Sequence, residues 1–376
     1  MRPRSQQVVA MLTRMSLKAQ LNALRNYYEW LLGRTMPRSL PVSLDIVLTR
    51  ACNLNCTFCI SYGSMGGRQA LPFEVYQEIA SVLFPAASLV AFCSGGEPLL
   101  YPRLRDALRL ARDHQLWVRI LSNGMLLSRE TSQWLIDDQS VDELGISFDG
   151  VRPETFERIR RGARFGTVLK NIEYLARLKE ERRQRTPILA FYYTVMRSNA
   201  EELPDLFGLC NSHGVEKVVV QYLNCSNDID FMESLYNHRP VAEDLLARVR
   251  HKARESGIDL SMAPIWYKRR SRKRCHWPWM FCQIDTDSSI RVCRKFWRQR
   301  IGFWDSGFQT VWQGQHYQRI RESVNSEEPY FPYCRHCYVQ TGLDSPAAHD
   351  MRLQADCYTI PGLEELQVEF QKRGQA

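Results

Sequence analysis

Short apolar runs alternate with amphipathic stretches through the middle of the chain. The apolar runs have the length of strands, and the stretches between them repeat their apolar positions at helical spacing. This order predicts right-handed βαβ units around a parallel sheet, an α/β fold whose ligand sites gather at the carboxyl ends of the strands. The expected strands cover 44–49, 89–93, 117–121, 143–148, 188–195 and 216–222. The expected helices between them cover 73–83, 103–114, 129–137, 167–181 and 202–213.

Two other patterns flank this alternation. Before residue 41, apolar residues recur at roughly helical spacing, and Pro37 and Pro41 end that segment. After Leu223 the alternation stops, and a helical pattern near 241–256 leads into a region rich in Cys and Trp. We therefore expect three parts: an N-terminal helical segment, a core, and a Cys-rich extension with a C-terminal tail, over 1–41, 42–235 and 236–376.

The composition of the 376-residue chain narrows its class. Apolar residues make up 44% and charged residues 24%, as in ordinary soluble globular proteins. Twelve cysteines without a recognisable signal peptide favour metal or redox chemistry over disulfides. The longest apolar stretch is too short to cross a bilayer, and we expect a cytoplasmic protein. The net charge is +9, and a basic run over 268–274 carries six of the positive charges. No nucleic-acid-binding motif accompanies that run, so nucleic acid is not an expected partner.

Three closely spaced cysteines carry the most chemical information. Cys52, Cys56 and Cys59 form a C-x3-C-x2-C spacing directly after the first expected strand. Three thiolates can hold three corners of a [4Fe–4S] cube, and no fourth Cys or His follows within thirty residues to complete a tetrahedral zinc site. A zinc knuckle and three unrelated core cysteines are the competing interpretations.

The spacing, with Phe58 directly before the last cysteine, resembles the signature of the radical S-adenosylmethionine (SAM) family. The resemblance implies a partial (β/α)6 barrel with the cluster beyond the first strand. It also implies that the open iron binds SAM, and that an electron from the cluster cleaves SAM to a 5′-deoxyadenosyl radical. A reducing partner such as flavodoxin or ferredoxin would supply that electron.

Polar segments at the ends of the next strands fit the same resemblance. A Gly-Gly-Glu-Pro run follows the second strand, and short polar side chains follow the third and fourth. In any α/β protein such side chains can simply cap the next helix. The resemblance implies instead that this rim holds SAM, with an Arg pairing with its carboxylate. The residues concerned are Gly95, Gly96, Glu97, Pro98, Ser122, Asn123, Ser147, Asp149 and Arg160, the last flanked by Arg158 and Arg161.

A second group of cysteines lies in the C-terminal extension. Cys275, Cys293, Cys334 and Cys337 offer four thiolates, a set that also suits a zinc ribbon. The surrounding Cys-His-Trp-Pro-Trp and Tyr-Cys-Arg-His-Cys runs resemble the SPASM or twitch extension of radical SAM enzymes, which implies one auxiliary [4Fe–4S] cluster. Cys282 and Cys357 are then left to replace a ligand, to pack as small apolar residues, or to donate a hydrogen atom to a substrate radical.

We accordingly expect a radical SAM oxidoreductase that abstracts a hydrogen atom from its substrate, with the auxiliary cluster handling the substrate electron. The favoured substrate is a sugar or aminocyclitol, which would be dehydrogenated or epimerised. The main alternative is a maturase that cross-links, oxidises or epimerises a ribosomally made peptide or protein. A non-enzymatic iron–sulfur or zinc scaffold is the alternative from another class, and the intact SAM-holding segments count against it.

Overall fold

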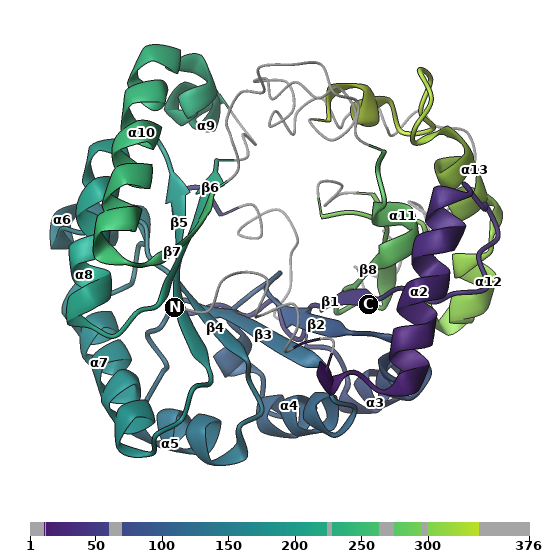
Figure 1. The fold of residues 1–376 in the computed structure, drawn as a ribbon, viewed down its shortest axis with the longest axis horizontal. Helices are drawn as coiled ribbons and strands as arrows, with labels where there is room; N and C mark the ends of the chain where they lie inside the picture. The colour runs from purple at the N-terminus through teal and green to yellow at the C-terminus, as the bar shows by residue number, and fades with distance from the viewer. Residues whose placement is uncertain are drawn as a thin grey trace.

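The strands form a curved, mostly parallel sheet with the helices on its outside (Figure 1). The computed structural model describes residues 11, 13–59, 70–223, 228–262, 274–294 and 299–337. Within that part of the chain, β1 to β7 are neighbours in chain order, and each pairs in parallel with the next. The expected α/β fold with a partial barrel is confirmed.

Six strands overlap the six that the sequence predicts: β1 Ser43–Ile46, β2 Leu89–Phe92, β3 Trp117–Ser122, β4 Glu143–Ser147, β5 Ile188–Val195 and β6 Lys217–Tyr222. Four further strands were not predicted: β7 Asp259–Met262, β8 Phe281–Ile284, β9 Ser289–Arg291 and β10 Gly302–Phe303. Because β8 pairs in parallel with β1, one sheet runs in the order β10-β9-β8-β1-β2-β3-β4-β5-β6-β7. Strands of this sheet therefore lie on both sides of the expected boundary at residue 235, and the division into three parts remains a prediction.

Capping residues mark the ends of several helices. Ser16 and Ser128 cap α2 and α5 by accepting a hydrogen bond from the Ala19 and Thr131 amides, and Gly257 ends α10 with a positive φ. No helix in the described ranges is both long and apolar enough to span a membrane. The helices are α2 Leu17–Leu31, α3 Phe73–Leu83, α4 Leu104–Asp113, α5 Arg129–Asp138, α6 Pro153–Ile159, α7 Phe165–Glu181, α8 Leu206–Ser212, α9 Asp228–Glu233, α10 Arg239–Ser256, α11 Trp277–Met280, α12 Phe308–Trp312 and α13 Gln315–Ser323.

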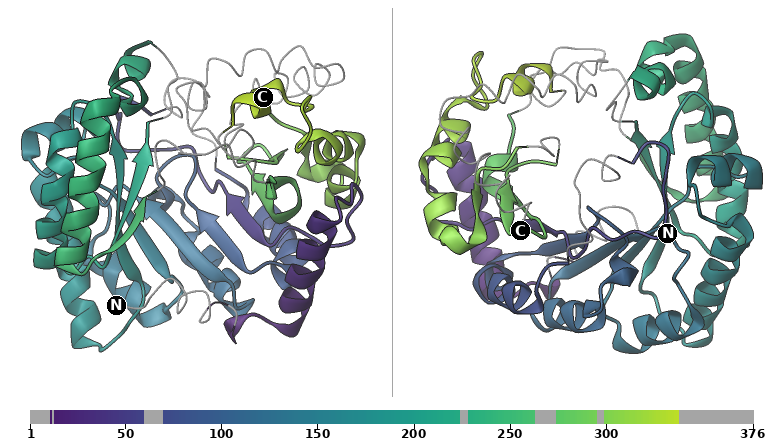
Figure 2. Two further views of the ribbon diagram at one scale, coloured as in Figure 1. Left: turned by 45° about the horizontal axis from the view of Figure 1, so that its top comes forward. Right: turned by 180° about the vertical axis from the view of Figure 1, so that it is seen from behind.

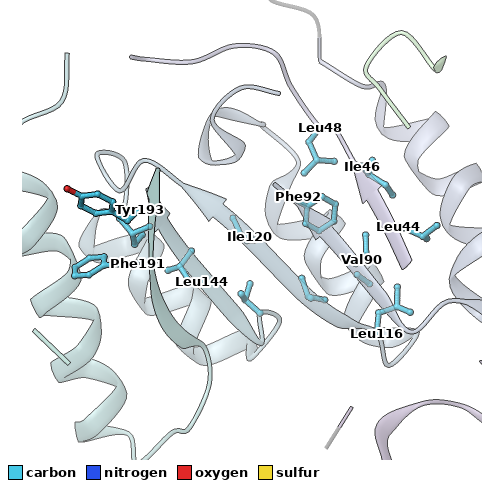
Figure 3. Close-up of a cluster of buried hydrophobic side chains, with 14 of the residues drawn as sticks. Leu44, Ile46, Leu48, Val90, Phe92, Leu116, Ile120, Leu144, Phe191 and Tyr193 are labelled. Carbon is cyan, nitrogen blue, oxygen red and sulfur yellow. The ribbon is translucent and has the colours of Figure 1, made fainter. Parts of the chain in front are cut away.

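The outer face of the sheet is apolar and packs against the helices. Side chains alternate between the two faces of a strand, so every second residue points outward. The outward-pointing side chains of β1 to β5 form one continuous buried layer (Figure 3). This layer includes Leu44, Ile46, Val90, Phe92, Ile120, Leu144 and Phe191. Burial of these side chains stabilises the barrel wall, at roughly 1.5–3 kcal/mol for each large side chain.

The inner face carries a row of polar residues in strict register. From β9 to β4, the residues that pair across the sheet are Arg291, Gln283, Asp45, Ala91, Arg119 and Glu143. Buried charges in such a row need partners. Arg294 Nε lies 2.9 Å from Asp45, and Lys217 donates to Glu143 at 2.8 Å. The inside of the barrel is therefore a network of paired charges.

The N-terminal segment packs against the C-terminal extension. Trp279 Nε1 donates to the Arg34 carbonyl at 2.7 Å, and Trp312 Nε1 donates to the Ser39 carbonyl at 2.9 Å. The views of Figure 2 agree in placing α2 beside the extension at one edge of the molecule. The first and last parts of the described chain thus pack together at one side of the partial barrel.

The charged row gives a stability prediction at Glu143. Arg119 and Lys217 both pair with this carboxylate, whose side chain is 1% exposed. Glu143→Gln leaves two cations facing each other inside the barrel, and we expect the free energy of unfolding at pH 7 to fall by about 3–5 kcal/mol. Urea denaturation of the apo-protein measures this. In Glu181→Gln, which loses an exposed pair with Arg177, the loss should stay below about 1 kcal/mol.

The loss of stability in Glu143→Gln should depend on pH. Burial raises the pKa of Glu143, but Arg119 and Lys217 outweigh burial and hold the pKa below its ordinary value of 4.5. The stability that the charge contributes is therefore complete above pH 4.5, and it disappears as the pH falls through the lower folded pKa. The difference between wild type and Glu143→Gln should shrink in acid. A difference that stays constant there would contradict the paired-charge interpretation.

Candidate functional site

The three cysteines of the first motif lie together beyond the end of β1. The thiols of Cys52, Cys56 and Cys59 act on one another electrostatically, and the Cys59 amide donates to the Cys56 carbonyl at 3.2 Å. Burial, reinforced by the neighbouring thiols, raises the pKa of Cys56 to about 11. Thiols with such raised pKa values stay protonated at neutral pH unless a metal binds the sulfur and displaces the proton. Three adjacent sulfur donors on one loop fit a metal–sulfur cluster held from one side.

Two glycines bring the next strand's loop against the stem of the cysteine loop. The Gly96 amide donates to the Thr49 carbonyl at 2.8 Å, and the Glu97 amide donates to the Ala51 carbonyl at 2.8 Å. A Cβ on Gly96 would lie 2.1 Å from the Ala51 oxygen, and Gly95 has a φ of +89°. The resemblance implies that these glycines belong to a rim that holds SAM. The close approach that the structure shows is to the chain's own backbone.

The Glu97 carboxylate ties the ends of β2 and β3 together. It is 2% exposed and accepts hydrogen bonds from Ser122 Oγ at 2.8 Å, the Asn123 amide at 2.7 Å and the Leu99 amide at 3.1 Å. Burial raises the pKa of this carboxyl despite those bonds. A carboxylate has about four acceptor positions, so one remains for a further donor. Pro98, also buried, begins the short 3-10 turn that follows.

Asn123 connects this rim to the cysteine loop. Its Nδ2 donates to Asn53 Oδ1 at 2.8 Å and lies 4.0 Å from the Cys52 sulfur. Asn53 was not among the residues predicted from the sequence. It lies within the cysteine motif, and the only available signal was its position beside Cys52. Ser147, at the end of β4, is buried on the inner face of the sheet.

Arg160 reaches the cysteine loop from the opposite side. Its Nη1 donates to the Cys56 sulfur at 3.7 Å, and its guanidinium lies 5.7 Å from the centre of the Phe58 ring. Asp149 forms an ion pair with Arg160 at 2.5 Å and accepts from the Thr194 amide at 2.6 Å. Burial lowers the pKa of Arg160, but Asp149 and Cys56 outweigh burial and raise it above the ordinary value. The neighbouring Arg158 and Arg161 are exposed, so Arg160 is the arginine of this site.

Asp149 is buried beneath the Arg160 guanidinium and is itself not exposed at the strand ends. Its side chain is fully buried, and its partners are Arg160 and a backbone amide. The resemblance suggested that Asp149 contacts the cofactor. In this geometry its visible effect is to hold the guanidinium in place beside Cys56. A buried carboxylate in this position fixes the direction of the charge that Arg160 presents.

The second group of cysteines also comes together. Cys275 is buried, and its pKa is raised by burial and then by the neighbouring Cys293 and Cys337 thiols. Cys334 lies in the same turn as Cys337, whose amide donates to the Cys334 carbonyl at 3.2 Å. Trp30 Nε1 donates to the Cys275 carbonyl at 3.0 Å, so the N-terminal helix fixes this segment.

Of the two remaining cysteines, Cys282 points away from the inside of the barrel. It lies on the outer face of β8, fully buried, and its thiol donates to the Gln283 carbonyl at 3.9 Å. Among the three roles left open for it, this placement favours packing over hydrogen donation. Cys357 lies outside the described residues. No set of three or more Cys, His, Asp or Glu side chains in the described ranges is arranged around a single metal ion.

The charged inner row was not among the features predicted from the sequence, although the sequence carries a signal for it. Asp45 and Arg119 lie within β1 and β3, and Glu143 and Lys217 begin the mostly apolar β4 and β6. In a strand buried on both faces, a charged residue indicates an inner side that is polar or functional. Tyr192, which donates to Glu143 at 2.7 Å, belongs to the same network.

Comparisons with known proteins agree with this geometry. Residues 46–210 match the family model described as the radical SAM superfamily. The antilisterial bacteriocin subtilosin biosynthesis protein AlbA of Bacillus subtilis (strain 168) is 23% identical over 326 residues, which are 82% of this chain and 70% of that protein. The PqqA peptide cyclase of Gluconobacter oxydans (strain 621H) is 24% identical over 69% of this chain and 70% of its own length. A GTP 3',8-cyclase of Limosilactobacillus fermentum (strain NBRC 3956 / LMG 18251), 25% identical, matches over 51% of this chain and 57% of its own length.

The fold is also similar to solved structures. Streptococcus suis SuiB bound to S-adenosylmethionine superposes with a TM-score of 0.65 at 17% identity, over 88% of this chain and 81% of that one. A structure of SuiB bound to its precursor peptide SuiA gives a TM-score of 0.62 at 16% identity, over 82% of this chain and 73% of that one. The family segment ends at residue 210, whereas the similarity to SuiB covers 88% of this chain. The structural similarity therefore includes part of the Cys-rich extension.

The contact at Gly96 gives a prediction for the site. Gly96→Ala places a Cβ on the Ala51 carbonyl, and the cysteine loop must shift. We expect a loss of about 1–3 kcal/mol in stability and a lower iron content after anaerobic reconstitution. Gly166→Ala is the matched control, because nothing lies within 4 Å of a Cβ at that exposed helical position. Full iron content and an unchanged urea midpoint in Gly96→Ala would show that the contact does not position the loop.

Proposed function

We propose that this chain, a radical SAM enzyme, modifies a ribosomally made peptide by abstracting a hydrogen atom from one of its carbon atoms. The observation that carries the proposal is the group of three coupled thiols, Cys52, Cys56 and Cys59, placed beside the Arg160 guanidinium at the carboxyl end of the barrel.

The three thiolates would hold a [4Fe–4S] cluster at three of its irons and leave the fourth for SAM. When bound, the cluster supplies the electron for reductive cleavage of SAM. The chain's own residues prepare the place around it. Arg160 presents a fixed positive charge that suits the SAM carboxylate, and Asp149 keeps that charge aimed. The Phe58 ring, close to the Arg160 guanidinium, covers one side of the site.

Glu97 is suited to the ammonium group of SAM. Three protein donors occupy all but one of its acceptor positions, so one position is left for the ammonium group. Asn123, Ser122 and Ser147 line the neighbouring strand ends, where ribose hydroxyls could bond. Gly95, Gly96 and Pro98 set the path of the loop that carries Glu97.

Cys275, Cys293, Cys334 and Cys337 would hold one auxiliary [4Fe–4S] cluster. Four ligands saturate such a cluster, which suits it to accept an electron from the substrate and not to bind the substrate. A four-cysteine zinc site is the competing possibility for the same residues. A one-electron donor such as flavodoxin or ferredoxin would serve the first cluster.

A peptide is the substrate class that the comparisons support best. The favoured expectation from sequence was a sugar or aminocyclitol, and the peptide maturase was the alternative. The match to AlbA extends over 82% of this chain, whereas the match to the GTP cyclase covers 51%. The similarity to SuiB with its bound precursor peptide supports the same choice. We therefore place the peptide maturase first and the sugar or aminocyclitol enzyme second.

Metal content and SAM cleavage test the cofactor assignment. Reconstituted wild type should bind about eight irons per chain, as two cubes require. Changing Cys52, Cys56 and Cys59 together to Ala should remove about four of them and abolish 5′-deoxyadenosine formation under dithionite. A triple variant that still forms 5′-deoxyadenosine would refute the assignment. About four irons and one zinc in wild type would assign the second site to zinc.

Mass spectrometry tests the substrate class. We expect that co-expression with short open reading frames adjoining the gene yields a peptide whose mass changes only when the enzyme is active. A cross-link or oxidation removes the mass of two hydrogen atoms, and epimerisation in D2O replaces one hydrogen atom with deuterium. The Cys52, Cys56 and Cys59 triple variant is the control. Unmodified peptides in all cases, with turnover of a sugar or aminocyclitol instead, would favour the second candidate.

A further inference from the structure

Helix α2 has its polar face inside and its apolar face outside. Asn22, Asn26 and Glu29 point inward and bond to the protein. Asn22 Nδ2 donates to the Ala86 carbonyl at 2.9 Å, and Asn26 Nδ2 donates to the Trp279 carbonyl at 2.7 Å. Glu29 accepts from the Arg38 and Ser39 amides at 2.9 and 3.0 Å. A surface helix normally buries its apolar side, so the outward face of α2 needs an explanation.

That outward face is a continuous apolar stripe. Eight of the twelve large hydrophobic side chains that are exposed in the described residues lie between residues 17 and 36. Five of them follow the alternating four- and three-residue spacing by which one helix packs along another. These five, called the α2 stripe, are Leu17 (71% exposed), Leu21 (58%), Leu24 (54%), Tyr28 (55%) and Leu31 (39%). A cluster of this kind on a protein surface marks a contact with another molecule.

The charges around the α2 stripe define what fits on it. Lys18 and Arg25 are exposed, each directly after a leucine of the stripe, and Arg34 and Arg38 follow the helix. The one acidic residue between residues 13 and 40, Glu29, is turned inward. A matching surface therefore carries apolar residues at helical spacing with acidic residues beside them. Two copies of this chain would instead bring cations against cations.

We propose that the α2 stripe docks an amphipathic helix with acidic flanks in the peptide substrate, at a segment separate from the residue that reacts. The inference rests on the proposed function, which supplies a peptide partner. Position supports it, because the inner face of α2 is bonded to the carbonyls of Cys275 and Trp279 in the extension. A peptide held on the stripe is thereby tethered to the region of the second cysteine group, which raises its effective concentration at the site.

A synthetic probe tests the proposal without the natural substrate. The probe is a fluorescein-labelled peptide of three heptads with Leu at the contact positions and Glu at the flanking ones. A scrambled peptide of the same composition is its control. Fluorescence anisotropy with the reconstituted full-length enzyme should show binding of the probe and not of the scrambled peptide. Leu21→Asp with Leu24→Asp should weaken binding about a hundredfold, and Val241→Asp, at an exposed site on α10, should not.

A charge swap distinguishes specific docking from nonspecific hydrophobic binding. Lys18→Glu with Arg25→Glu should weaken binding of the Glu probe and strengthen binding of a probe with Lys at the same positions. Equal binding of both probes by wild type and charge-swapped enzyme would overturn the proposal. So would loss of dimers, measured by light scattering, in Leu21→Asp with Leu24→Asp, because the occupant would then be a second copy. Binding to phosphatidylglycerol vesicles that needs the stripe, without probe binding, would assign it to a membrane surface.

The same samples separate this inference from the proposed function. The stripe variants lie outside the cofactor site, so their iron content and 5′-deoxyadenosine formation should equal those of wild type. Normal SAM cleavage without probe binding would refute the docking surface alone. Absent SAM cleavage in wild type would refute the proposed function, whatever the probe does.

Discussion

The candidate site depends on one close contact between two loops. Gly96 and Glu97 donate backbone hydrogen bonds to the carbonyls of Thr49 and Ala51, and only a residue without a Cβ fits at position 96. This contact fixes the stem of the cysteine loop against the end of β2. It also sets Glu97 where it can accept from the end of β3, which in turn places Asn123 beside Asn53. A chain of short, directional bonds thus joins three strand ends into one rigid rim.

A second constraint acts inside the barrel. The outer face of the sheet is apolar and packs on helices, whereas the inner face holds Asp45, Arg119 and Glu143 in one register row. Each of these charges is paired, since an unpaired charge there would be too costly. The result is an interior that is polar yet structurally stable. This pairing satisfies the charges of the inner face and leaves the apolar outer face to pack against the helices.

Much of this arrangement was predictable from sequence. Strands β1 to β6 are mostly apolar runs between helical patterns, and the cysteine and Gly-Gly-Glu-Pro motifs lie at their ends. Strands β7 to β10 were missed because they follow the regular alternation of apolar runs and helical patterns, and β8 joins the sheet by pairing with the distant β1. The inner row was not predicted, because the pairing register between neighbouring strands cannot be deduced from the sequence of a single strand. The same limit applies to Cys282, a suggested hydrogen donor, because only the pairing of β8 with β1 shows that its thiol faces outward. The sequence could not distinguish Arg160 from Arg158 and Arg161 as the arginine of the site. The structure does, because Arg160 is buried and the other two are exposed.

We propose that the rim beyond β1 binds SAM directly at a cluster held by Cys52, Cys56 and Cys59. Electron paramagnetic resonance of the dithionite-reduced enzyme, recorded before and after addition of SAM, is the decisive test. We expect a reduced [4Fe–4S] signal whose g-values shift when SAM binds. The variant lacking these three cysteines should show only a signal that SAM leaves unchanged. A wild-type spectrum that SAM does not alter, at concentrations where SAM binding is measured independently, would contradict the account.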